Sequence, residues 1–272
     1  MTKGRSDSVF AGSIPKLYDE LLVPLIFEPY AADLARRLAA LRLEHVLEIA
    51  AGTGVVTRAM AAALHERVSI IATDLNQPML DHASAVGTGR PVEWRQADAM
   101  QLPFRDAQFD AVVCQFGAMF FPDRIKAYFE ARRVLRPGGT LLFSVWDRID
   151  DNEFAAFVTA VLQDMFPQDP PLFLRRTPHG YFDTELICSD LAKAGFATKP
   201  QITTVAARSR ARSPQIPAVA YCRGTPLLNE IVARDASRVD QAVERAAAAV
   251  AARFGNSAVD GKIQAHIVRI ER

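Results

Sequence analysis

The sequence has little cysteine, little net charge and no long apolar run. Its 272 residues contain three cysteines, and 32 basic residues nearly balance 31 acidic ones, which gives a formal net charge of +1. Cysteines this few and this widely spaced form neither a disulfide framework nor a zinc site, and the five histidines lack the spacing of metal ligands. A nearly neutral chain offers no electrostatic basis for binding nucleic acid. We therefore expect no metal and no nucleic-acid partner.

The chain also lacks the segments that direct a protein to a membrane. No apolar stretch approaches the ~20 residues of a transmembrane helix. The first residues, MTKGRSD, do not contain the apolar core of a signal peptide. The composition is otherwise that of a globular protein, with 50% hydrophobic and 23% charged residues. These observations predict a cytoplasmic protein with no membrane span.

The most informative stretch is residues 46–57, VLEIAAGTGVVT, a short apolar strand followed by a glycine-bearing turn that opens a helix. The N-terminus of a helix exposes unpaired N–H groups, and glycine lets the backbone approach a ligand closely. A second apolar strand, 68–73, is followed by Asp74. A carboxylate at that place binds ribose hydroxyls in doubly wound sheets. The pattern predicts a nucleotide-sized cofactor site.

Two cofactors compete for this site, a nicotinamide dinucleotide and S-adenosylmethionine. The dinucleotide fingerprint requires a third glycine, and Thr57 stands at that position. Glu48 precedes the glycines, and its carboxylate would repel a pyrophosphate but suits a ligand with an ammonium and a sulfonium. We therefore favour S-adenosylmethionine, and a nicotinamide-dependent oxidoreductase is the alternative.

Five ordered motifs carry a family resemblance. They are residues 48–54, Asp74, residues 96–104, residues 109–115 and residues 135–142. With them the chain resembles the class I S-adenosylmethionine-dependent methyltransferases over roughly residues 40–147, and particularly the ubiquinone/menaquinone-biosynthesis branch. Ala50 replaces the first glycine of the family pattern, and a small residue keeps this turn if its φ is negative.

The resemblance implies roles for individual residues. Glu48 would reach the methionine end of the cofactor, Asp74 the ribose, Leu75 and Met79 the adenine ring, and Asp98 the adenine amino group. N-terminal helices that carry Tyr18 would cover the cofactor. The full predicted cofactor-binding set is Tyr18, Glu48, Ala50, Gly52, Thr53, Gly54, Asp74, Leu75, Met79, Asp98, Ala99, Met100, Gln115 and Phe116.

Several of these residues also have a purely structural interpretation. Asp98 by itself is typical of a helix N-cap. Phe116, like most phenylalanines, is more often found in a core than in a ligand site. Residues 136–139, RPGG, are a turn that identifies the fold without taking part in chemistry.

Strands and helices alternate along the chain, which predicts a parallel sheet built from βαβ units. Strands are expected at 45–49, 68–73, 92–96, 109–114, 140–146, 200–206 and 262–270, and helices at 54–64, 77–86, 123–134, 152–166 and 184–195. In residues 15–41, Pro24 and Pro29 should interrupt two short helical pieces. The expected fold is α/β, a Rossmann-like, doubly wound, mostly parallel seven-stranded sheet with N-terminal helices and a helical insertion between the last two strands.

We expect one domain, 1–272, with three parts: a helical cap at 10–41, a cofactor-binding core at 42–147 and a substrate-side half at 148–272. The insertion near 210–258 belongs to the last part. It carries an apolar stripe at helical spacing, formed by Val239, Val243, Ala246, Val250 and Phe254. Because such a stripe must be buried, the insertion is either a lid over the acceptor or a contact in a homodimer.

The predicted function is transfer of a methyl group from S-adenosylmethionine to a small-molecule metabolite by in-line displacement, with S-adenosylhomocysteine as the product. The Asn/Asp-Pro-Pro-Tyr signature of DNA amino-methyltransferases is absent after residue 114. A base is needed only if the acceptor must lose a proton. Asp147, His179 and Tyr181 are candidates, and the sequence assigns none of them. A non-catalytic S-adenosylmethionine-binding protein is a further alternative.

Overall fold

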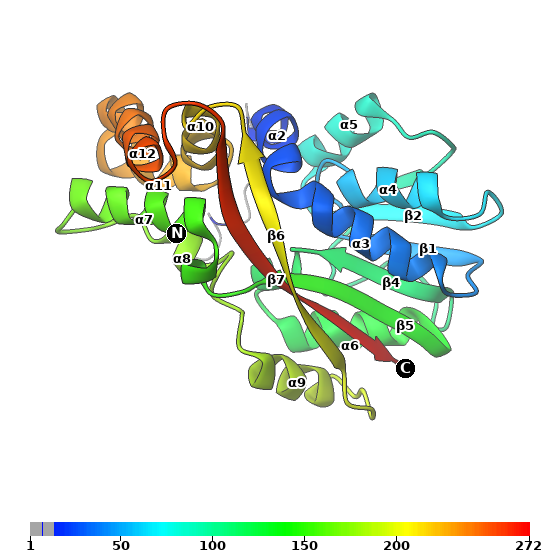
Figure 1. Cartoon of the computed structure of the whole chain (residues 1–272). Helices are drawn as coiled ribbons and strands as arrows, with labels where there is room; N and C mark the ends of the chain where they lie inside the picture. Colours follow the sequence, from blue (N-terminus) through cyan, green and yellow to red (C-terminus); the bar gives the residue numbers. More distant parts are fainter. Residues whose placement is uncertain (1–6, 8–13) are drawn as a thin grey trace. The chain divides into compact units, whose positions relative to one another are not determined.

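The computed structural model describes residue 7 and residues 14–272 (Figure 1), so residues 10–13 of the predicted cap lie outside the described residues. Contacts divide the chain into two compact units. Unit 1 comprises Met1–Phe27, Trp146–Gly180 and Ala206–Gln264, and unit 2 comprises Glu28–Val145, Tyr181–Val205 and Ala265–Arg272. These boundaries differ from the predicted partition of the chain, and the assignment of 1–272 as a single domain stays a prediction.

Seven strands form one sheet in the order β3-β2-β1-β4-β5-β7-β6 (Figure 1). The strands are β1 His45–Ile49, β2 Ser69–Asp74, β3 Glu93–Gln96, β4 Phe109–Gln115, β5 Leu135–Trp146, β6 Gln201–Ala211 and β7 Val259–Glu271. The pairs β2–β3, β1–β2, β1–β4 and β4–β5 are parallel. The strand order reverses between β1 and β4, and doubly wound sheets bind ligands at such a switch point.

The last strand of unit 2 runs against its neighbour. The amide of Gly138 donates to the carbonyl oxygen of Arg272 at 3.0 Å, and the amide of Arg272 donates to the carbonyl oxygen of Gly139 at 2.9 Å. The end of β7 therefore pairs with the start of β5, so these strands are antiparallel. The mostly parallel, seven-stranded α/β fold expected from the sequence is confirmed.

The helices of unit 2 flank the sheet. They are α3 Glu28–Ala39, α4 Val55–Ala63, α5 Gln77–Val86, the short η2 Ala118–Phe120, α6 Arg124–Val134 and α9 Thr184–Lys193. Helix α3 packs against α4, and α6 packs against α9. Residues 46–49 of β1 and 140–146 of β5 are buried without alternation, as in strands covered on both faces.

The predicted break in the N-terminal helical region is wrong. In unit 1, α2 Ile14–Leu17 leads directly into a π-helix, η1 Tyr18–Phe27, which contains Pro24. Pro29 lies in the first turn of α3 in unit 2, where a missing N–H costs no helical hydrogen bond. Pro24 lacks its N–H in a π-helix as in an α-helix, and local departures from α geometry commonly accompany a proline inside a helix.

The other elements of unit 1 are helical. They are η3 Ile149–Asp151, α7 Glu153–Met165, α8 Phe173–Arg176, α10 Gln215–Arg223, α11 Leu227–Asp235, η4 Ala236–Arg238 and α12 Val239–Phe254. Helices α10 to α12 are the predicted insertion. Val243, Ala246 and Val250 of its stripe are buried, and α12 packs against α7 and α10. Most of the stripe is therefore buried inside unit 1, and the choice between a lid and a homodimer contact stays open.

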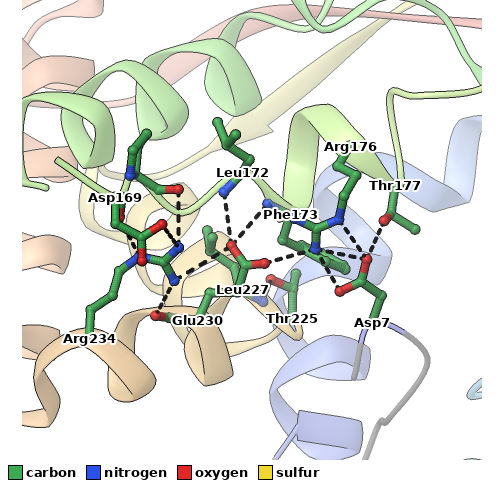
Figure 2. Close-up of polar contacts among 11 residues, drawn as sticks. Asp7, Asp169, Leu172, Phe173, Arg176, Thr177, Thr225, Leu227, Glu230 and Arg234 are labelled. Carbon is green, nitrogen blue, oxygen red and sulfur yellow. Dashed lines mark hydrogen bonds and ion pairs between the residues drawn. The ribbon is translucent and has the colours of Figure 1, made fainter. Parts of the chain in front are cut away.

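A polar network joins distant segments of unit 1 (Figure 2). Arg176 donates through Nη2 to Asp7 Oδ1 at 2.7 Å and to Glu230 Oε1 at 2.8 Å. Thr177 Oγ1 also donates to Asp7, and the second oxygen of Glu230 accepts from the amide of Leu172. The side chains of Asp7 and Glu230 are only 8% and 17% exposed. Arg176 is thus the cation that two largely buried carboxylates share.

We expect Arg176→Met to lower the free energy of unfolding by about 2 kcal/mol, because both carboxylates lose a charged donor. Urea denaturation followed by circular dichroism measures the change. Arg175→Met is the matched control, because the pair of Arg175 with Asp150 is long, 3.7 Å, and exposed on both sides. The control should stay within about 0.5 kcal/mol of the wild type. Equal losses in the two variants would show that the network adds no stability.

Candidate functional site

The glycine turn between β1 and α4 is built from three left-handed residues. Ala50 has φ +55°, Gly52 has φ +56°, and Gly54, the N-cap of α4, has φ +83°. The expectation of a negative φ at Ala50 is therefore wrong. The turn adopts the left-handed conformation at three alternate positions, and Ala50 is the first of them. This conformation costs roughly 1–2 kcal/mol for a residue with a Cβ. Alanine keeps that cost small.

A glycine in the segment after β4 makes room for the side chain of Ala50. A Cβ built on Gly117 would lie 2.5 Å from Ala50 Cβ and 2.7 Å from Cys114 Sγ. Neither distance is tolerable between real atoms, so Gly117 allows the β1 turn and the β4 segment to approach each other. Both segments stand at the carboxyl edge of the sheet, next to the switch point.

Asp74, the last residue of β2, fastens the glycine turn. Its Oδ2 accepts a hydrogen bond from the amide of Gly52 at 2.9 Å, and its Oδ1 accepts one from the amide of Asn76 at 2.8 Å. The side chain is 7% exposed, and burial raises the pKa of this carboxyl. The side-chain amide of Asn76 also donates to Oδ1, at 3.3 Å. A carboxylate has about four acceptor positions, and Oδ2 is the oxygen with the fewer of these contacts, so it is the atom that could accept from a ligand hydroxyl.

Glu48 lies in β1, just before the turn, and is 1% exposed. Its Oε2 accepts a hydrogen bond from Thr57 Oγ1 at 2.6 Å. Burial raises the pKa of Glu48 to about 8. Oε1 accepts no hydrogen bond from any residue that the structure describes. Thr57 is a residue of the candidate site that the sequence pattern did not identify, because only its hydrogen bond to Glu48 reveals its role.

The adenine side of the predicted site is less buried. Leu75 is 52% exposed, which is unusual for a leucine, while Met79 of α5 is buried. Asp98 accepts a hydrogen bond from the amide of Met100 through Oδ1 at 2.8 Å, inside a tight turn. Because no helix begins there, the N-cap interpretation of Asp98 is wrong. The turn also holds Ala99, and both Ala99 and Met100 are half-buried.

Gln115 ends β4 at the same edge of the sheet, and Phe116 follows it. Phe116 has φ +52°, a strained conformation for an aromatic residue. Its amide donates to the carbonyl oxygen of Ser144 at 3.0 Å, and its ring meets Tyr30 edge-on with the centroids 5.3 Å apart. Strain of this kind concentrates at functional sites.

Unit 2 thus contains every predicted cofactor-binding residue except one. Tyr18 belongs to unit 1, where its ring stacks on Phe27 with the centroids 5.0 Å apart. Its role over the cofactor stays a prediction. Thr53, in the glycine turn, is 1% exposed, and its Oγ1 has no hydrogen-bond partner among the described residues. A buried hydroxyl of this kind next to two acceptor carboxylates fits a polar ligand.

Tyr181 is structural. Its hydroxyl donates to Asp190 Oδ2 at 2.8 Å, and the guanidinium of Arg124 lies over its ring, 4.2 Å from the centroid. Because Tyr181 is 2% exposed and its proton is already donated, it is not available as a base. It instead fixes α9 to α6 within unit 2.

His179 and Asp147 contact each other in unit 1. His179 Nδ1 lies 2.8 Å from the carbonyl oxygen of Asp147, and the ring packs near Trp146 with the centroids 5.9 Å apart. A carbonyl can only accept, so Nδ1 carries the proton and Nε2 keeps its lone pair. Burial lowers the pKa of His179 to about 4, so the ring is neutral near pH 7.

The described residues contain no group of three or more histidine, cysteine or acidic side chains placed to hold a metal ion. No helix among them combines the length and the apolar composition needed to cross a membrane.

Comparisons with known proteins agree with this geometry. A family model described as "Methyltransferase domain" matches residues 47–143, all in unit 2. A demethylmenaquinone methyltransferase of Lactiplantibacillus plantarum is 36% identical over 141 residues, which cover 50% of this chain and 58% of that protein. The enzyme of the same name from Thermus thermophilus is 31% identical over 195 residues, 64% of this chain and 87% of that protein.

A solved structure shows the same fold. It is an N-methyltransferase from Haemonchus contortus in complex with phosphomonomethylethanolamine and S-adenosylhomocysteine, with a TM-score of 0.59 and 15% identity over 95% of this chain and 57% of that one. At this identity the likeness concerns the fold alone. The family assignment rests on the sequence relatives, because this chain matches 87% of the Thermus protein at 31% identity. This chain belongs to the class I S-adenosylmethionine-dependent methyltransferase family.

Proposed function

We propose that the protein transfers a methyl group from S-adenosylmethionine to a small-molecule acceptor. The observation that carries this proposal is the pair of buried carboxylates, Glu48 and Asp74, on either side of a left-handed glycine turn. No cation of the chain forms an ion pair with either carboxylate among the described residues. Two buried acceptors without an ion-pair partner suit a ligand that carries positive charge and hydroxyl donors.

The residues present fit each part of this cofactor. Asp74 would accept from the ribose hydroxyls, and Glu48 would accept from the ammonium group through Oε1. The exposed side chain of Leu75, with Met79, would contact the adenine ring, and Asp98 would accept from its amino group. Gly52 leaves room for a close approach, because a Cβ built there meets only Met79 Cε, at 3.8 Å.

The same features disfavour a nicotinamide dinucleotide. Two buried carboxylates beside the turn would repel a pyrophosphate. Thr57 stands where a dinucleotide site needs glycine, and its hydroxyl is bonded to Glu48. An oxidoreductase therefore remains the weaker candidate.

The bound cofactor would supply a methyl group attached to a sulfonium sulfur, which is a good leaving group because it departs as a neutral thioether. The chain would then have to bind the acceptor, orient it for in-line attack and exclude water. For an acceptor that must lose a proton, a general base is needed as well. The names of the relatives support an aromatic, partly apolar acceptor of the quinone-precursor kind.

Two measurements test the proposal. Isothermal titration with S-adenosylhomocysteine and, separately, with NAD should show binding of the first ligand only. Transfer of labelled methyl from S-adenosylmethionine to a panel of phenols, hydroquinones and amines then distinguishes an enzyme from a protein that only binds the cofactor. Binding of NAD without S-adenosylhomocysteine would refute the proposal, and binding without transfer to any acceptor of the panel would favour the non-catalytic alternative.

A further inference from the structure

We propose that Thr57 is a positioning residue whose hydroxyl favours the ionised form of Glu48, the form that binds the cofactor, so that cofactor affinity depends on the protonation of Glu48. The inference rests on the proposed function and extends it, because it assigns the regulation of the site by pH to a residue outside the predicted cofactor-binding set.

The geometry of the pair supports this role. Thr57 is fully buried in α4, and its hydroxyl is 2.6 Å from Glu48 Oε2. A hydroxyl donates to an ionised carboxylate more strongly than to a neutral acid, so this contact favours the charged form. It also occupies one oxygen and leaves Oε1 for a donor from outside the chain. One hydrogen bond therefore favours the charged form of the carboxylate and also fixes its orientation.

The surroundings of Glu48 make that hydrogen bond important. Asp74 of β2 is a second acid whose charge disfavours ionisation of Glu48, and burial acts in the same direction. Arg58 of α4 favours the ionised form weakly, and Cys114 of β4 is a neutral thiol because burial raises its pKa to about 12. Of the neighbouring groups, Thr57 acts most strongly to lower the pKa of Glu48.

The consequence is a proton linkage. With a pKa of about 8, Glu48 is mostly protonated near pH 7 in the free protein, and a ligand ammonium that pairs with the carboxylate must displace that proton. Affinity should rise as the pH approaches and passes the pKa of Glu48. Removing the Thr57 hydroxyl should raise that pKa further, by about one unit, and so weaken binding about tenfold near pH 7.

The test compares Thr57→Val, which has nearly the same shape without the hydroxyl, with Thr57→Ser, which retains it. S-adenosylhomocysteine is titrated by calorimetry from about pH 6.5 to pH 9.5. Because both proteins bind the same ligand, the protonation of the ligand affects both affinities equally and cancels in the ratio of wild-type to variant affinity. We expect Thr57→Val to bind about tenfold more weakly near pH 7 and within about twofold near pH 9.5, while Thr57→Ser keeps the wild-type profile. Thr159→Val, which removes another buried hydroxyl from helix α7, is the matched control and should leave the profile unchanged.

A second readout needs no ligand. The infrared band of a protonated carboxyl group, identified by its loss in Glu48→Gln, should disappear on raising the pH, with a midpoint about one unit higher in Thr57→Val. An equal deficit of Thr57→Val at every pH, or an unchanged infrared midpoint, would overturn the role of Thr57 while leaving the cofactor assignment intact. Failure of the wild type to bind S-adenosylhomocysteine would instead refute the proposed function.

Discussion

Asp74→Ala is expected to weaken the binding of S-adenosylhomocysteine about 100-fold, or roughly 3 kcal/mol. The substitution removes the acceptor for the ribose hydroxyls. It also leaves the amides of Gly52 and Asn76 without the carboxylate that accepts from them at 2.9 and 2.8 Å. The glycine turn would then lose its link to β2, so the cost should exceed that of a ligand contact alone. Isothermal titration measures the affinity.

Two further variants make this result interpretable. Asp81→Ala removes an exposed carboxylate from α5, the helix that follows β2, and should leave the affinity within about twofold. Asp74→Asn keeps one oxygen acceptor but loses the charge, so its affinity should lie between those of Asp74→Ala and the wild type. If Asp74→Ala and Asp81→Ala bind S-adenosylhomocysteine equally well, Asp74 does not bind the ribose.

Most of the parallel sheet could be predicted from local sequence. The first strand was expected at 45–49 and the helix after the second strand at 77–86, and the structure gives His45–Ile49 and Gln77–Val86. These elements are short apolar runs or amphipathic segments with clear ends, so their periodicity is sufficient. The fifth strand, expected from 140, begins at Leu135, which pairs with Phe109 of β4. Residues 136–139, expected as a turn, belong to this strand, and Gly138 and Gly139 pair with Arg272. A partner more than a hundred residues away is invisible to a local pattern.

The features that the sequence did not predict also depend on more than a local pattern. Proline statistics indicate a break in an α-helix, but they do not foresee that η1 continues as a π-helix through Pro24. The network of Asp7, Arg176 and Glu230 joins three segments that are far apart in the sequence and have no common motif. Charge counting cannot reveal such a network, because it depends on tertiary packing.

The residues of the candidate site that belong to a recognisable sequence motif could be predicted. Glu48 and Asp74 were identified from the ends of two strands, and in the structure both are buried and accept hydrogen bonds. Their roles toward a cofactor stay a prediction. The residues that support them were not predictable. Thr57 is recognised only by its hydrogen bond to Glu48, and the φ of Ala50 depends on the space that Gly117 leaves open. Tyr181 had the right chemistry for a base, but its contact with Asp190 shows that its role is structural.

The contact between Ala50 and Gly117 leads to the second large effect. We expect Gly117→Ala to lower the free energy of unfolding by about 3 kcal/mol, because its Cβ would lie 2.5 Å from Ala50 Cβ and 2.7 Å from Cys114 Sγ. Urea denaturation measures the loss. Gly89→Ala is the control, since a Cβ there meets nothing within 4 Å, and it should change the stability by less than about 0.5 kcal/mol.

A double-mutant cycle tests whether the contact with Ala50 Cβ causes the loss of stability in Gly117→Ala. Ala50→Gly alone should change the stability by less than about 1 kcal/mol, because relief of the left-handed strain at φ +55° offsets the added freedom of the unfolded chain. Combined with Gly117→Ala, it should restore about 1 kcal/mol or more relative to the sum of the single effects, since one of the two colliding atoms is gone. Recovery stays incomplete, because Cys114 Sγ still opposes the new Cβ. Strict additivity would show that Ala50 and Gly117 do not compete for space, and the left-handed alanine of the cofactor turn would then need another explanation.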